Sequence, residues 1–496
     1  MRRTVLSILV VALLVVVPVS AAGGVVNAAG RSALASDSVS DAPTALQQGS
    51  NPCVGTMERT PDGTTLFSIQ GARGSEKTSA MVVGANPNGS VVGVHNDTAA
   101  GRWWSYDIDV LSNGNVLQAT TESRHTVVEE IDPETGDHVT ERHFRDTLDA
   151  HDVDLINGDE LLVNDMSQDG EDRVFIYNLT REEVVWEYYF ANYSEQYPES
   201  GGGEFGGDWT HNNDVERIGD GTIMVSVRNF DTVVAIDRES KDVAWALGED
   251  DNTSVLNEQH NPDYFESEDG APTVLVADSL NDRVVEYEFE GGEANNASRA
   301  SSDSSDGKWN QTWVARGGGL NEPRDADRLP NGNTLIADRR AHRIVEVTPA
   351  GDVVWEMYAP YQPYDVERVE TGDESSGPTM ADAGAAGTVE VTGSAPFDTA
   401  DVEACYDFLT GFEDERLIPD DELDDVRSQS PTDSVGNDDG AEGEDENSSN
   451  SATDETGDSA LGTPTEGSGP TPLGPLLALG VVAALLVGAF VRLRRR

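Results

Sequence analysis

The sequence of 496 residues has few basic residues and little cysteine. Lys and Arg total 32 against 92 Asp and Glu, which gives a formal net charge of −60. This balance argues against a nucleic-acid partner, because phosphate binding depends on basic surface. A strongly acidic surface is typical of a protein kept soluble at high salt, where charge repulsion is screened over a few Å. We interpret the chain as halophilic, with an ordinary acidic exported protein as the alternative.

Long apolar runs lie near the two ends of the chain. Residues 1–22 combine an Arg pair, an apolar run and small residues, which predicts a secretory signal peptide or, alternatively, a retained N-terminal anchor. Residues 473–492 predict a transmembrane helix, and the basic tail at 493–496 predicts that the body of the protein is extracellular. We therefore expect a location at the cell membrane, with the membrane as a partner through this C-terminal helix.

Two further segments lack the apolar periodicity of folded elements. Residues 23–50 are rich in Ala, Ser and Gly and are expected to be a linker. Residues 411–472 are dominated by Asp, Glu, Ser, Thr and Gly, and they predict a disordered acidic stalk.

Between these segments, one pattern recurs with a different residue at its first position. Its copies are YDIDVL from Tyr106, HDVDLI from His151, HNNDVE from His211, HNPDYF from His260, RDADRL from Arg324 and YDVERV from Tyr364. The copies begin 40 to 64 residues apart, which brackets the roughly 40–50-residue period of propeller blades once insertions are allowed for. Short runs rich in Val, Ile and Leu are separated by turn dipeptides such as Asn157-Gly158. The pattern predicts an all-β fold, a six-bladed β-propeller at 51–410.

The last blade of this propeller is predicted to be shared between the two ends of the domain. The text from Thr64 matches the later strands of a repeat but lacks the opening strand, and that strand is found as YDVERV from Tyr364. A closing blade built from both termini leaves no seam held by side chains alone. We place Cys53 and Cys405 on this blade, Cys405 on its C-terminal strand, and predict a disulfide because exported proteins favour one.

In a propeller, equivalent positions of the innermost strands lie on one ring around the central channel. The variable first position therefore predicts a ring of six side chains, namely Tyr106, His151, His211, His260, Arg324 and Tyr364. The Asp that follows two or three residues later persists, as in Asp154 and Asp214, and we assign it to bonding the backbone between blades. A packing position would repeat one residue type, so the variable position favours function.

Two kinds of site fit such a ring. Three imidazoles could bind a metal ion, which would suit a hydrolase or lyase. A guanidinium in the ring would repel a cation, however, and Arg228 in VSVRNFD is also expected to reach the channel. Arginines beside histidines suit an oxyanion such as a sulfate or phosphate ester, and a histidine is then free for nucleophilic or acid–base work. We favour the anion site, with no metal and no cofactor.

The residues from about Asn51 to Glu370 resemble the arylsulfotransferase family of six-bladed propellers. The text WTHNNDVERIGDGTIMVSVRNFDTVVAID from Trp209 and EQHNPD from Glu258 carries most of the resemblance. Members of that family move a sulfuryl group from a phenolic sulfate ester to a phenol acceptor through a sulfurylated histidine, without a nucleotide donor.

The resemblance implies a role for each catalytic candidate. His260 looks like the nucleophile, His211 and Arg228 look like the pair that stabilises the sulfuryl oxygens, and His151 looks like the histidine that assists proton transfer. The ring residues Arg324, Tyr106 and Tyr364 are then expected to bind the substrate. The spacing of 32 residues between Arg228 and His260 departs from the family pattern. The alternative from another class is a non-catalytic cell-surface propeller that binds a ligand at its channel mouth, since text such as ADRRAHRIVEV from Ala337 also resembles repeats that often only bind.

Overall fold

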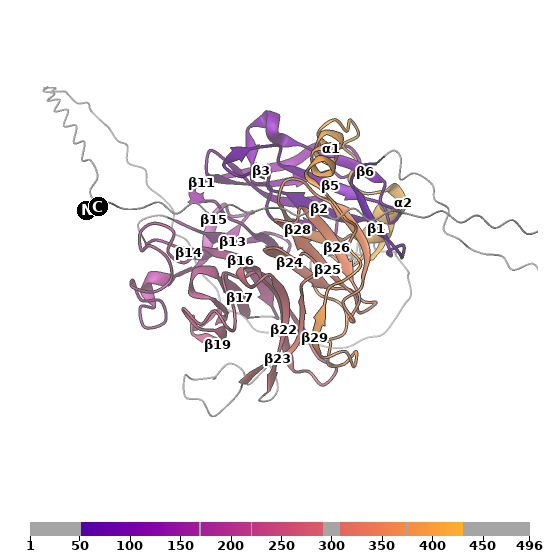
Figure 1. Cartoon of the computed structure of the whole chain (residues 1–496). Coiled ribbons are helices and arrows are strands. Elements are labelled where there is room, and N and C mark those ends of the chain that lie inside the picture. Colours follow the sequence, from indigo (N-terminus) through magenta and orange to yellow (C-terminus); the bar gives the residue numbers. More distant parts are fainter. Residues whose placement is uncertain (1–50, 168–169, 220, 291–307, 373, 430–496) are drawn as a thin grey trace, which may run out of the picture. The chain divides into compact units, whose positions relative to one another are not determined.

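The computed structural model describes residues 51–167, 170–219, 221–290, 308–372 and 374–429 (Figure 1). All of them belong to one compact unit, Met1–Thr432. The predicted signal peptide, the linker, the stalk beyond residue 429, the transmembrane helix at 473–492 and the tail at 493–496 lie outside the described residues. None of the helices within the described residues is long and apolar enough to cross a membrane.

The described residues form six four-stranded antiparallel sheets, which are the six blades of a propeller. Blade 1 is β8 (Ile108–Val110), β9 (Val116–Glu122), β10 (His125–Ile131) and β11 (His138–Leu148), with β7 (Arg102–Trp103) also on β9. Blade 2 is β12 (Val153–Ile156), β13 (Glu160–Asp165), β14 (Arg173–Asn178) and β15 (Glu183–Tyr189). Blade 3 is β16 (Asn212–Ile218), β17 (Thr222–Val227), β18 (Thr232–Asp237) and β19 (Val243–Gly248).

The remaining blades complete the ring. Blade 4 is β20 (His260–Glu266), β21 (Pro272–Asp278), β22 (Arg283–Glu290) and β23 (Lys308–Arg316), extended by β29 (Gly387–Glu390) in parallel. Blade 5 is β24 (Pro323–Arg328), β25 (Thr334–Asp338), β26 (Arg343–Val347) and β27 (Val353–Tyr358), extended by β1 (Val54–Met57). Blade 6 is β28 (Pro363–Arg368), β2 (Thr65–Ile69), β5 (Met81–Ala85) and β6 (Val91–His95). In Figure 1 the inner strands β16, β24 and β28 are labelled near the middle of the blades, and β19 and β23 further out.

Short elements lie between the strands and after the last blade. They are the hairpin β3 (Ala72–Arg73) and β4 (Glu76–Lys77), the 3₁₀ turns η1 (Asp97–Ala100), η2 (Phe190–Asn192), η3 (Arg228–Phe230) and η4 (Ser279–Asn281), and the helices α1 (Thr399–Thr410) and α2 (Asp420–Gln429). Among them, only η1 and η2 lie between consecutive blades in the described residues. Turns η3 and η4 each follow the second strand of a blade directly, so they hold the side chains at that edge in fixed positions.

Blade 6 confirms the prediction of a shared closing blade. Its innermost strand, β28, comes from the C-terminal part of the propeller, and its other three strands come from the N-terminal part. Strand β2 pairs with β28 over Thr65–Ile69, with a register shift between Phe67 and Ile69. Because main-chain hydrogen bonds join the two ends of the domain, the ring closes without an open seam.

Blade-to-blade packing is apolar and includes the tryptophans of the fourth strands. Trp245, Trp313 and Trp355 are at most 4% exposed and belong to apolar clusters with residues of the next blade. Trp186 is half-buried, and its indole N–H donates to the carbonyl oxygen of Arg238 in the next blade at 2.8 Å. These side chains are therefore structural.

Carboxylates also join neighbouring inner strands. Asp107 accepts from the N–H of Val153 at 3.2 Å, and Asp365 accepts from the N–H of Ile108 at 2.8 Å. We expected the persistent Asp of the repeat to make these bonds. Asp154 does so, because it accepts from the backbone of Arg217 in the next blade, but the other bonds are made by residues that directly follow the variable position, namely Asp107, Asp152, Asp325 and Asp365. The persistent Asp214 and Asp327 instead each keep a buried carboxylate oxygen without a hydrogen-bond partner among the described residues.

The disulfide between Cys53 and Cys405 is present, but it does not lie where the sequence suggested. Cys405 is on helix α1 and not on a strand, and Cys53 directly precedes β1, which pairs with β27 of blade 5. Both cysteines belong to the apolar cluster that spans blades 5 and 6. The bridge therefore fastens α1 over the junction of these blades, and it closes a chain separation of 352 residues.

Residues 411–429 pack on the propeller, so the predicted start of the disordered stalk at 411 is wrong. Leu417, Ile418 and Leu423 are fully buried in a cluster with the apolar side chains of blades 1 and 6. The N–H of Leu417 donates to the carbonyl oxygen of Pro133 at 2.8 Å, and Arg427 pairs with Glu134 at 2.8 Å. A few apolar residues within an acidic run thus bury enough surface to hold this segment on the propeller.

Candidate active site

A cavity of about 400 Å³ lies at one end of the central channel. Its lining includes all seven side chains that the sequence singled out as catalytic or substrate-binding: Tyr106, His151, His211, Arg228, His260, Arg324 and Tyr364. The other lining residues are Gln70, Lys77, Trp104, Arg124, Asp149 and Arg339. The structure thus brings the predicted ring together, and it adds six side chains that the sequence did not indicate.

Two repeated positions supply most of this lining. The variable residue stands at or just before the start of each inner strand, as His211 does before β16 and His260 does at the first residue of β20. A second position is the residue that directly follows the second strand, namely Gln70 after β2, Arg228 after β17 and Arg339 after β25. A search of the sequence for this second repeated position would have found Gln70 and Arg339. Lys77 on β4 and Arg124 in the β9–β10 turn have no such signal.

His260 is fixed from its Nδ1 side. Nδ1 lies 2.9 Å from the hydroxyl oxygen of Ser279 and 3.1 Å from the carbonyl oxygen of Glu258. The Ser279 hydroxyl donates to the carbonyl oxygen of Pro323 at 2.6 Å, so its oxygen is free to accept a hydrogen bond from Nδ1–H. In that tautomer the lone pair is on Nε2, which is the form that a nucleophile needs.

Arg324 lies against the same imidazole. Its Nη1 is 2.8 Å from Nδ1 of His260, and its Nη2 donates to Glu322 at 3.0 Å. A guanidinium only donates, so Arg324 bonds Nδ1 only in the tautomer with the proton on Nε2, whereas the carbonyl oxygen of Glu258, which only accepts, favours the tautomer with the proton on Nδ1. In either tautomer the guanidinium opposes a second proton on the ring. The Nε of Arg324 is buried without a hydrogen-bond partner among the described residues, which leaves a donor for a ligand.

Three aromatic rings surround His151. The ring of Tyr106 lies 4.0 Å from the His151 ring, centroid to centroid, and the ring of Tyr364 lies 5.6 Å from it. The Nδ1–H of His151 faces the carbonyl oxygen of Asp149 at 2.9 Å, and the Tyr106 hydroxyl donates to the Asp149 carboxylate, also at 2.9 Å. His151 therefore presents Nε2 as a free acceptor near His211, whose ring centroid is 5.2 Å away.

His211 and Arg228 are each held by a carboxylate. Nδ1 of His211 lies 2.6 Å from Asp208, which ends the long Gly-rich insertion before β16. Arg228 pairs with Glu258 through Nη2 and donates from Nη1 to Asn229 at 2.9 Å. The Nε of Arg228 is buried and lacks a hydrogen-bond partner among the described residues. Like Arg324, Arg228 thus retains a donor for a ligand.

Burial and neighbouring cations keep all three imidazoles uncharged. Burial and the Arg324 guanidinium hold the pKa of His260 well below its usual range. Burial, followed by His211 and Arg324, does the same to the pKa of His151. Burial also lowers the pKa of His211, although its bond to Asp208 opposes this shift. At neutral pH the cavity therefore holds three neutral imidazoles beside charged guanidinium groups.

The lining carries more positive than negative charge, in contrast to the whole chain. Among the described residues, five basic side chains and one carboxylate line the cavity: Lys77, Arg124, Arg228, Arg324 and Arg339 against Asp149. In a chain of net charge −60, this is a concentration of donors suited to an anion. The three cavity imidazoles do not belong to any group of metal-ligating atoms within 4.8 Å of one another among the described residues. The geometry thus favours the anion site over the metal alternative.

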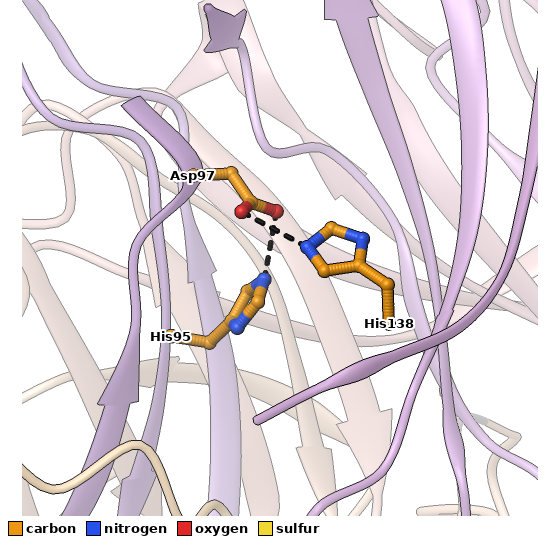
Figure 2. Close-up of side chains that lie close together, drawn as sticks. All are labelled: His95, Asp97 and His138. Carbon is orange, nitrogen blue, oxygen red and sulfur yellow. Dashed lines mark hydrogen bonds and ion pairs between the residues drawn. The ribbon is translucent and has the colours of Figure 1, made fainter. Parts of the chain in front are cut away.

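A separate histidine cluster lies between blades 6 and 1, outside the cavity. Figure 2 shows His95 and His138 pointing at the two oxygens of Asp97, at 2.7 and 3.1 Å. Nδ1 of His138 lies 2.7 Å from Glu129, which in turn accepts from Arg102. Each carboxylate in this cluster has a cationic or imidazole partner, so we assign it to holding η1 against β10 and β11.

The sequence matches a known protein family. The profile of the family described as Arylsulfotransferase (ASST) matches residues 34–297, more than half of the chain. A search of curated proteins found no match.

Solved structures match the chain at low identity and low TM-score. A protein of unknown function from Bacteroides caccae is 12% identical with a TM-score of 0.40, and the match covers 68% of this chain and 100% of that one. An inactive variant of virginiamycin B lyase from Staphylococcus aureus, solved with quinupristin, is 11% identical with a TM-score of 0.34, and the match covers 61% and 87%. The family match, which spans more than half of the sequence, shows that this chain belongs to the arylsulfotransferase family.

Proposed function

We propose that this protein moves a sulfuryl group from a phenolic sulfate ester to a phenol acceptor through a covalent intermediate on His260. The observation that carries the proposal is the cavity itself, in which neutral imidazoles lie beside arginines that keep unused donors. A sulfate ester is an anion with three terminal oxygens, and a guanidinium can donate to two of these oxygens at once.

In the first half-reaction, Nε2 of His260 attacks the sulfur and the bond from sulfur to the phenolic oxygen breaks. The electron pair leaves with the phenolate, and an acidic phenol departs without a proton. Arg228 neutralises the sulfuryl oxygens, and His211 donates to them when it carries a proton on Nε2 while Asp208 holds Nδ1–H. Each well-placed donor contributes a few kcal/mol to the transition state. Arg324 lies behind His260 and keeps it neutral before attack.

In the second half-reaction, the acceptor phenol attacks the sulfur of the sulfohistidine and loses its proton, while the bond from sulfur to Nε2 of His260 breaks and its electron pair returns to Nε2. Nε2 of His151 is a free acceptor, because Nδ1–H is held by Asp149, so His151 takes that proton. The resulting imidazolium can protonate the phenolate released from the next donor. Tyr106 and Tyr364 pack against His151 and provide flat aromatic surface for the two phenols.

Turnover of a chromogenic aryl sulfate tests this proposal. Release of the chromogenic phenol should depend on an added acceptor phenol, and the acceptor should be recovered as its sulfate ester. Turnover should persist after treatment with a chelator. Release of inorganic sulfate independent of the acceptor would indicate a hydrolase, and absence of turnover with tight binding of the ester would indicate a binding propeller.

We further propose that the protein is exported, is anchored at the cell membrane by residues 473–492 and works at high salt. The disulfide between Cys53 and Cys405 supports an oxidising compartment. Protease treatment of intact cells, followed by detection of the propeller in the released fraction, tests the extracellular location.

A further inference from the structure

We propose that the opposite end of the central channel binds one calcium ion. There the inner strands enclose a second cavity of about 20 Å³, and eight of its eleven lining residues carry a carboxyl group. No Lys, Arg or His lines it among the residues that the structure describes. A cavity of that volume holds about one particle of the size of a water molecule, so it has room for a single ion.

The carboxylates of this cavity divide into two sets. Asp107, Asp152 and Asp325 accept hydrogen bonds from backbone N–H groups of the neighbouring blades, which accounts for their presence. The second set is Asp214, Glu216, Asp263, Asp327 and Glu374. Of these, Glu216 also accepts the N–H of Tyr264 in the next blade at 3.0 Å, so four carboxylates remain without such a bond. Asp214, Asp263 and Asp327 are at most 8% exposed, and proteins rarely bury carboxylates unless these are paired or bind a cation.

Within the second set, three carboxylates converge on one point. Ligand oxygens of Glu216, Asp263 and Glu374 lie within 4.8 Å of one another. They come from β16, from β20 and from the segment that follows β28, so they join blades 3 and 4 to the chain beyond the closing strand. The nearby guanidinium of Arg328 pairs with Glu286 through Nη2 at 3.0 Å, and it acts on Asp263 only through its charge, because its Nε and Nη1 form no hydrogen bond with any described residue.

A second observation, independent of this convergence, is that oxygens in the cavity lack partners. Oδ2 of Asp214 and Oδ2 of Asp327 form no hydrogen bond with any described residue, although these residues are only 8% and 4% exposed. Both residues line the same small cavity. An unpaired buried carboxylate oxygen is costly, and a bound cation would satisfy both.

The ligand chemistry selects calcium. All of the candidate ligands are oxygens, which are hard donors that zinc and copper do not prefer. Calcium accepts six to eight oxygen ligands in irregular arrangements, whereas magnesium keeps several of its waters and needs an octahedron. A cavity with room for about one particle cannot hold a magnesium ion together with its waters.

Calcium content and thermal unfolding of the full-length chain test the proposal. Protein stripped with EGTA and then dialysed against micromolar CaCl₂ in high KCl should retain one calcium per chain, measured by mass spectrometry of the metals. Calcium should raise the Tm by several degrees, because the ion binds the folded chain and not the unfolded one. Magnesium at the same concentration should give a clearly smaller shift.

The double variant Asp214→Asn, Asp327→Asn separates an ion site from a general effect of acidic surface. It keeps the shape of both side chains and removes two ligand charges, so the calcium affinity should fall at least about tenfold. Without calcium, the variant should have a Tm equal to or above that of the stripped wild type, because two acidic groups crowded by other carboxyl groups are replaced by neutral amides. The matched control is Asp97→Asn, whose carboxylate is held by His95 and His138, and it should retain one calcium per chain.

Three results would overturn the proposal. They are a wild-type chain that retains no stoichiometric calcium, a double variant that binds calcium as tightly as the wild type, and an equal response to magnesium. If the double variant does not fold, the single variant Asp327→Asn replaces it with the same expected direction. Aryl sulfate turnover does not enter this test, so it stands apart from the proposed enzymatic function.

Discussion

The two ends of the central channel are built from the same six strands and carry opposite charge. At one end the variable residues and their neighbours present arginines and uncharged imidazoles, and burial with Arg324 lowers the pKa of His260. At the other end, burial and the neighbouring Asp154 and Asp263 raise the pKa of Asp214 well above its usual range. Burial alone discourages every charge, so the neighbours that each end supplies decide which ligand it accepts.

The two ends lie only one to five residues apart along a strand. His211 lines the cationic end, and Asp214 and Glu216 of the adjoining β16 line the acidic end. Tyr364 lies between them, with its ring against His260 and its hydroxyl donating to the carbonyl oxygen of Asn213 at 3.2 Å. A single repeated strand can thus serve two ligands of opposite charge when a bulky uncharged ring separates them.

The largest effect on the cationic end is expected from His260→Ala. Removal of the attacking nitrogen should lower turnover of an aryl sulfate by roughly 10⁴-fold or more. Mass spectrometry after brief exposure to the donor should locate the sulfuryl group on His260 in the wild type. His138→Gln is the control, because it removes an imidazole outside the cavity and should keep turnover. A sulfuryl group found on His211 would assign the nucleophile to that residue instead.

Arg228→Lys tests whether the cationic end needs a fork of donors or only a charge. Lysine keeps the charge but cannot replace the guanidinium geometry, so turnover should fall about 10²-fold with a small change in Tm. The control is Arg238→Lys, which alters a guanidinium paired with Glu160 away from the cavity. Wild-type turnover in Arg228→Lys would show that charge alone suffices.

The disulfide provides a change that touches neither end of the channel. Cys53→Ser with Cys405→Ser should lower the free energy of unfolding by up to about 5 kcal/mol, the limit set by chain entropy for so long a loop. Thermal unfolding measures this loss, and non-reducing peptide mapping confirms the pair in the wild type. Folded molecules of the variant should retain both calcium binding and turnover. Loss of either activity in them would tie α1 to the channel.

The smallest expected effect is a shift in the pH profile of Arg324→Gln. Arg324 lowers the pKa of His260, so its removal should raise that pKa. Neutral His260 is the active form, and the acid limb of kcat/KM should therefore move to higher pH. The position of this limb is the readout, because the amplitude also changes with binding. An unmoved limb would show that burial alone keeps His260 neutral.

The repeat made the ring of channel residues and the closing blade predictable from sequence. Equivalent positions of a propeller meet at its axis, so the alignment of His151, His211 and His260 was enough to place them together. Lys77 and Arg124 could not be found in this way, because they lie on a short hairpin and in a turn that belong to single blades. Their contribution depends on how these loops fold over the channel.

The sequence did not predict two other features, the packing of residues 411–429 and the carboxylates that join the blades, because both depend on contacts between distant parts of the chain. Residues 411–429 read as stalk because they are acidic, yet Leu417 and Leu423 meet an apolar surface already formed by blades 1 and 6. The persistent Asp was assigned to blade closure because of its regularity. At the inner strands β8 and β12, which have no register shift, the residue that directly follows the variable position, Asp107 or Asp152, already reaches the backbone of the next blade.

The shared closing blade also determines when the site can exist during synthesis. Tyr364 belongs to β28, and the three strands that pair around it in blade 6 are made some 270 residues earlier, at Thr65 to His95. A chain that is interrupted or cleaved before Pro363 therefore contains the inner strands of five blades. It lacks Tyr364, whose ring separates the two ends of the channel. The N-terminal strands must wait, unpaired on one side, until nearly the whole propeller has emerged. Both ligand sites are consequently gained in one late step, which keeps an unfinished chain from binding either ligand.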